Sequence, residues 1–106
     1  MKITDLLGEA TEYDKKQAVE HKKVKSWLKS VSAFANTAGG TLIFGITDGE
    51  EIVGLEDIKS DSEFISQKIK EKISPFPEVT MKLHKTENEK ELLLLHVPAG
   101  AETPYY

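Results

Sequence analysis

The chain contains neither cysteine nor arginine among its 106 residues. Without cysteine it can form no disulfide bond and no thiolate metal site. Without arginine it lacks the side chain that best reads guanine edges through paired hydrogen bonds. No apolar run approaches the roughly 20 residues needed to span a bilayer, and no signal peptide opens the chain. We therefore expect a cytoplasmic protein with no membrane partner.

The remaining composition is typical of an ordinary globular domain. Hydrophobic residues make up 39% of the chain and charged residues 30%, which are usual values for a folded protein. The length suits one domain with a compact core. We find no internal repeat, low-complexity tract or linker, so we expect residues 1–106 to form a single domain.

The segment from Ser26 to Asp48 carries the clearest structural pattern. Apolar residues recur at helical spacing and predict a main helix over about 22–37 with one wide apolar face: Trp27, Leu28, Val31, Phe34 and Ala35. We expect Asn36, Gly39 and Gly40 to end this helix, because glycine reaches positive φ without a Cβ clash. The apolar run from Thr41 to Ile46 then predicts an interior strand.

The rest of the pattern predicts more strands and a second helix. This helix should begin at Asp61 or Ser62 and end before Pro75. Strands are expected over about 11–17, 41–47, 52–55, 79–83 and 92–97. The predicted fold class is α+β, a two-layer sandwich with two main helices packed on a mixed β-sheet.

Positive charge is concentrated near the main helix, although the net charge of the chain is −4. Residues 15–36 hold one acid, Glu20, and six lysines: Lys15, Lys16, Lys22, Lys23, Lys25 and Lys29. Residues 37–106 hold seven lysines and thirteen acids. Because lysine meets phosphate as a point charge, the cluster indicates DNA or RNA binding through the backbone. The alternative is that these lysines form only a solvated face.

The motif AFAN-x-x-GG-x-L-x-x-G-x-x-D gives a family resemblance. It lies in the segment SAFANTAGGTLIFGITD, followed by Ile52-Val53-Gly54-Leu55 and Pro104-Tyr105-Tyr106. These residues resemble the Schlafen AlbA_2 domain, to which DNA binding is ascribed, with Asn36, Gly39, Gly40 and Gly45 as structural motif positions. In bacteria that domain usually opens a larger transcriptional regulator or ATP-binding protein. The resemblance implies a DNA-binding module whose partners include the C-terminal domains of the same protein.

The resemblance also implies an enzymatic alternative, a metal-dependent endoribonuclease. Family members with ribonuclease activity use three carboxylates, which match Glu9, Asp14 and Asp48. Such a cluster could hold Mg²⁺ or Mn²⁺, which prefer oxygen ligands. The family most often has Glu, an aromatic residue and Lys where this chain has Asp14-Lys15-Lys16. We therefore expect turn and strand-end roles for these acids, and no enzyme activity or cofactor in the isolated domain.

A third alternative is self-association into a homodimer. The hydrophobic strands at 41–46 and 92–97 could leave an open sheet edge, and open edges pair readily with another chain. The family pattern continues beyond Tyr106 into a further strand that carries Arg. We therefore expect the chain to be a piece of a longer protein, in which that strand covers an edge.

Overall fold

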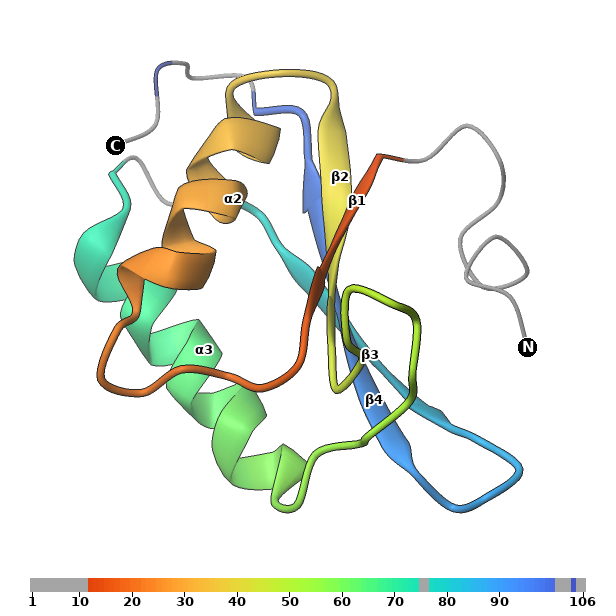
Figure 1. The fold of residues 1–106 in the computed structure, drawn as a ribbon. Helices are drawn as coiled ribbons and strands as arrows, with labels where there is room; N and C mark the ends of the chain where they lie inside the picture. The colour runs from red at the N-terminus through yellow and green to blue at the C-terminus, as the bar shows by residue number, and fades with distance from the viewer. Residues whose placement is uncertain (1–11, 75–76, 101–103, 105–106) are drawn as a thin grey trace.

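A computed structural model describes residues 12–74, 77–100 and 104. The described elements, in chain order, are β1 (Tyr13–Lys16), α2 (Lys25–Ala35), β2 (Gly39–Phe44), α3 (Ile58–Lys72), β3 (Thr80–Lys85) and β4 (Glu91–Pro98). Both helices pack on one face of a four-stranded sheet (Figure 1). This arrangement confirms the predicted α+β sandwich. In the described part of the chain, neither helix has the length and hydropathy of a membrane-spanning segment.

The strand order in the sheet is β1-β2-β4-β3. β1 pairs with β2 in parallel, and β4 pairs antiparallel with β2 on one side and β3 on the other. The mixed sheet was therefore predicted correctly. The expected open edge at 41–46 or 92–97 was wrong, because β2 and β4 are both interior strands. The sheet edges among the described residues are β1 and β3.

The main core lies between the helices and the sheet. Trp27 is its largest fully buried side chain, and its ring meets Phe44 edge-on with centroids 6.1 Å apart. The other fully buried members come from α2, α3 and the interior strands: Val31, Ala35, Leu42, Ile65, Ile69, Leu93, Leu95 and Val97. A smaller cluster on the opposite face of the sheet joins Ile43, Ile46, Leu92 and Leu94. The apolar face predicted for the main helix is thus the face that packs on the sheet.

Gly39 and Gly40 open β2 rather than cap the helix, which corrects the expectation from the sequence. α2 ends at its C-cap Asn36, whose N–H bonds to the Ser32 carbonyl at 3.0 Å. Gly39 has φ +88°, and a Cβ there would lie 2.8 Å from the Val97 carbonyl oxygen. A Cβ on Gly40 would lie 2.5 Å from the Phe34 ring. The two glycines therefore allow the end of α2 to approach the sheet closely.

Two other boundaries differ from the prediction. α3 begins at Ile58, because the carboxylate of Asp57 caps it by accepting the Ser60 N–H at 3.1 Å, so Asp61 and Ser62 lie inside the helix. Residues 52–55 form no strand in the described structure beyond a single bridge between Ile46 and Ile52. Two consecutive N–H groups, at 53 and 54, both bond to the carbonyl of Gly45 (2.9 and 2.8 Å), so the ladder cannot continue.

We predict that Gly39→Ala lowers the free energy of unfolding by at least about 1–2 kcal/mol, the cost of a left-handed conformation for a residue with a Cβ. The close Val97 carbonyl adds to this cost. Gly49→Ala is the matched control, because its Cβ would meet only Thr47 Oγ1 at 3.9 Å, and it should change stability by less than about 0.5 kcal/mol. Urea unfolding of both variants checks the prediction, which equal effects would contradict.

Candidate nucleic-acid interface

The N-terminal end of α2 combines several positive charges, and its first helical turn carries no acid. Lys22 and Lys23 precede the helix, Lys25 and Lys29 lie on it, and all four are exposed. The N-cap position is Val24, which offers no side-chain hydrogen bond, and the first turn has no acidic residue. Because a helix N-terminus is itself a partial positive charge, these lysines add to the existing potential. The result is a local concentration of positive charge at this end of the helix.

The loop that carries Lys22 and Lys23 is anchored by contacts of the two residues that precede them, Glu20 and His21. Trp27 Nε1 donates to the Glu20 carbonyl at 3.0 Å. The next residue, His21, bonds through Nε2 to Asp61 Oδ1 at 2.9 Å and stacks on Phe64 with ring centroids 3.9 Å apart. These contacts hold the loop against α3. The two lysines therefore start from a fixed backbone, which reduces the entropy lost when they bind a ligand.

A hollow between α2 and the end of α3 brings Lys72 close to the lysines of α2, which the sequence analysis did not predict. The hollow measures about 560 Å³ and is lined by Val24, Lys25, Leu28, Lys29, Ser32, Lys72 and Ile73. A neighbouring hollow of about 500 Å³ is lined by Lys22, Lys23, Val24, Lys25, Ser26 and Lys29. They share three residues, so we treat them as one feature, the basic groove. The sequence signal for Lys72 was only its place in a lysine-rich last turn of the second helix.

Lys15 and Lys16 lie apart from the basic groove, on the edge strand β1. Lys15 Nζ donates to the backbone carbonyl of Asp48 at 2.8 Å. Lys16 Nζ lies 3.5 Å from Asp14 Oδ2. Both ammonium groups therefore have partners within the domain. The structure brings together four of the six predicted lysines and adds Lys72.

One acid, Glu71, lies next to Lys72 on α3. It accepts hydrogen bonds from Gln67 Nε2 at 2.9 Å and Lys68 Nζ at 3.2 Å. These two bonds, with the nearby ammonium groups of Lys68 and Lys72, hold the pKa of Glu71 below its usual value. Glu71 is thus ionised at neutral pH and offsets part of the positive charge of Lys72. We expect Lys25 and Lys29 to contribute more than Lys72 to any binding of an anion.

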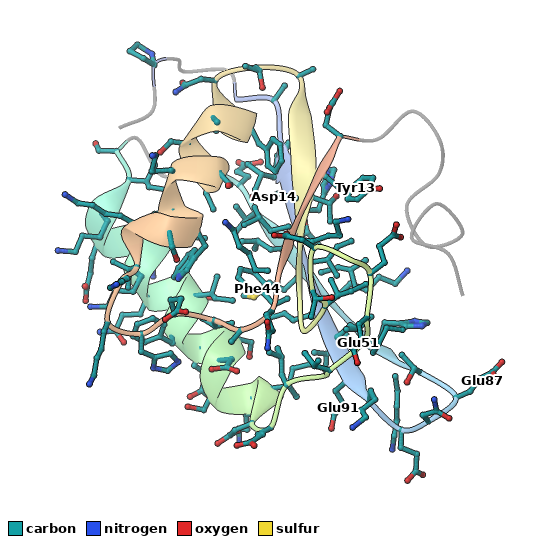
Figure 2. All side chains as sticks on the ribbon, viewed as in Figure 1. Tyr13, Asp14, Phe44, Glu51, Glu87 and Glu91 are labelled. Atoms are coloured by element: carbon teal, nitrogen blue, oxygen red, sulfur yellow. The ribbon has the colours of Figure 1, made fainter. Side chains whose placement is uncertain are left out.

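The three carboxylates of the ribonuclease alternative have different surroundings. Glu9 lies outside the described residues. Asp14 lies on the side of β1 that faces α2, opposite to Tyr13 (Figure 2), and accepts a hydrogen bond from Ser30 Oγ at 2.7 Å. Asp48 lies in the exposed turn after β2. The described residues contain no group of three or more acids or histidines placed to hold a metal ion, and the partners of Asp14 give it a structural role in tying β1 to α2.

Comparison with known proteins identifies the type of domain. The model of the family described as "Schlafen, AlbA_2" matches residues 9–106. No curated protein matches the chain. The fold is similar to the N-terminal domain of a Nitrosomonas europaea protein named as a candidate ATP-dependent DNA helicase RecG-related protein, with a TM-score of 0.67 and 23% identity over 95% of this chain and 78% of that one. It is also similar to the DIP2311 protein of Corynebacterium diphtheriae, with a TM-score of 0.55 and 26% identity over 88% of this chain but only 21% of that one.

The helix dipole predicts that replacing a lysine changes the free energy of unfolding in opposite directions at the start of α2 and at the end of α3. Lys25→Gln removes a positive charge from a helix N-terminus and should raise the free energy of unfolding by about 0.3–1 kcal/mol at low salt. Lys70→Gln removes one from the last turn of α3 and should lower it by a similar, roughly 0.3–1 kcal/mol amount. Urea unfolding at low and high salt measures both. Changes of the same sign would show that the local potential differs from the one described.

Proposed function

Because the chain belongs to the Schlafen AlbA_2 family, we propose that it is a nucleic-acid-binding module whose basic groove contacts the phosphate backbone. The observation that carries the proposal is the set of Lys22, Lys23, Lys25 and Lys29 at a helix N-terminus without an acid. Their side chains are exposed, and the residues between 21 and 36 include no carboxylate that could neutralise them. These positive charges are therefore available to an external anion.

The chemistry of the groove favours phosphates over base edges. Lysine ammonium groups bind phosphate oxygens in many orientations and carry little sequence information. The N-terminus of α2 is suited to the same ligand, since its dipole attracts negative charge. Two of the acids, Glu87 and Glu91, lie on the β3–β4 hairpin, away from α2 (Figure 2). Such a separation of charge orients the domain as it approaches a polyanion.

We further propose that the module serves a larger protein, with the regulatory, ATP-dependent or catalytic activity in other domains. The support is that this chain corresponds to only 21% of the Corynebacterium diphtheriae protein that shares its fold. In this proposal the module supplies affinity for DNA or RNA, and its partner domains supply specificity. A transcriptional regulator is the parent protein that the family resemblance favours.

The decisive variant replaces Lys22, Lys23, Lys25 and Lys29 together by glutamine. We expect its affinity for a fluorescein-labelled duplex to fall by at least about tenfold at roughly 50 mM salt, because up to four phosphate contacts are lost. The slope of log K against log salt should also flatten, by up to about 0.9 for each lost contact. Fluorescence anisotropy across a salt series measures both quantities.

The matched control replaces four exposed lysines outside the basic groove: Lys59, Lys82, Lys85 and Lys90. Both variants lose four positive charges, so they have the same net charge. The control should keep most of the affinity and the salt slope of the unmodified chain. Equal losses in the two variants would show that binding follows net charge alone and would refute the assignment to the basic groove.

A further inference from the structure

The basic groove has an apolar floor that phosphate binding does not use. Val24, Leu28 and Ile73 line it beneath a rim of lysines. A phosphodiester gains nothing from apolar walls, since moving its charge away from water is costly. Leu28 and Ile73 are buried members of the core, and Val24 is half-buried. A ligand that supplied only phosphates would therefore leave uncovered the apolar surface that remains accessible, at Val24 and along the aliphatic stems of the lysines. The lining instead suits a molecule with both negative charge and a flat apolar body.

The dimensions of the groove fit a single molecule of this kind, with a flat apolar body and charged groups at its edges. Lys25, Lys29 and Ser32 follow one another along a single stripe of α2, with one turn of about 6 Å between the two lysines. The end of α3 forms the facing wall with Lys72 and Ile73. A volume of about 560 Å³ lies within the roughly 300–1,000 Å³ of small-molecule sites. The groove can thus hold a nucleobase between charged edges.

We propose that the basic groove receives an unpaired base of a single-stranded nucleic acid, while the flanking phosphates contact Lys25 and Lys29. This inference rests on the proposed function and specifies its ligand. Bases in a duplex are paired and stacked, whereas those of a single strand can be turned outwards into a protein. Every base has an apolar face and contact with that face involves no hydrogen-bond readout, so we expect binding to be tolerant of sequence. Ser32 lines the groove together with these lysines.

The test fills the groove without changing any charge. Ser32→Leu places an apolar side chain inside it, and Ala33→Leu places the same side chain on an exposed position of α2 outside the groove. The probes are an oligothymidylate of about 20 nucleotides and an abasic strand of equal length, both end-labelled for anisotropy. The unmodified chain should bind oligothymidylate at least about fivefold more tightly than the abasic strand. Ser32→Leu should remove this difference, and Ala33→Leu should keep it.

Three results would overturn the inference. The first is equal affinity of the unmodified chain for the two strands, and the second is an equal effect of Ser32→Leu on both. The third is competition by poly-glutamate as effective as that by unlabelled oligothymidylate, which would show that the surface recognises negative charge alone. Failure of the proposed function has a different signature. In that case the variant with glutamine at positions 22, 23, 25 and 29 would have the same affinity as the unmodified chain for each of the two strands.

Discussion

The close approach of the end of α2 to the start of β2 is the constraint on which the rest of the structure depends. Gly39 adopts a φ that a side chain would disfavour, and Gly40 leaves room for the Phe34 ring. On the other side, the Gly100 N–H bonds to the Ala35 carbonyl at 2.8 Å. The helix is thus joined to two strands at its C-terminal end. Because α2 is fixed at its C-terminal end and by its buried face, the position of its N-terminal end, which carries the lysines, is also fixed.

This packing determines which lysines are free to bind a ligand. α2 turns its apolar face towards the sheet, so the four lysines at 22, 23, 25 and 29 remain exposed. Among the described residues, no acid forms an ion pair with any of them. The lysines of β1 lie beside backbone and carboxylate oxygens at the sheet edge, and they have partners there. The lysines that are clustered at 15–29 in the sequence therefore separate into two environments in the fold. The net charge of −4 reflects neither of them.

The sequence was sufficient for features that depend on local patterns. The apolar spacing around Trp27 predicted the main helix and its buried face, and the apolar run at 41–46 predicted an interior strand. Features that depend on distant residues were not predictable in this way. Asp57 can be identified as the N-cap only when the first residue of α3 is known. The two edge strands of the sheet can be identified only when the strand pairing is known. The place of Lys72 in the basic groove depends on the packing of two helices that are far apart in the sequence.

Mapping the bound surface by NMR tests the central claim most directly. An ¹⁵N-labelled sample would be titrated with unlabelled oligothymidylate while the backbone amide shifts are followed. The account predicts that the largest changes fall at residues 22–32 and at 72–73, where the basic groove lies, and that the β3–β4 hairpin at 82–90 changes little. Changes centred on that hairpin or on the opposite face of the sheet, with residues 22–32 unaffected, would contradict it.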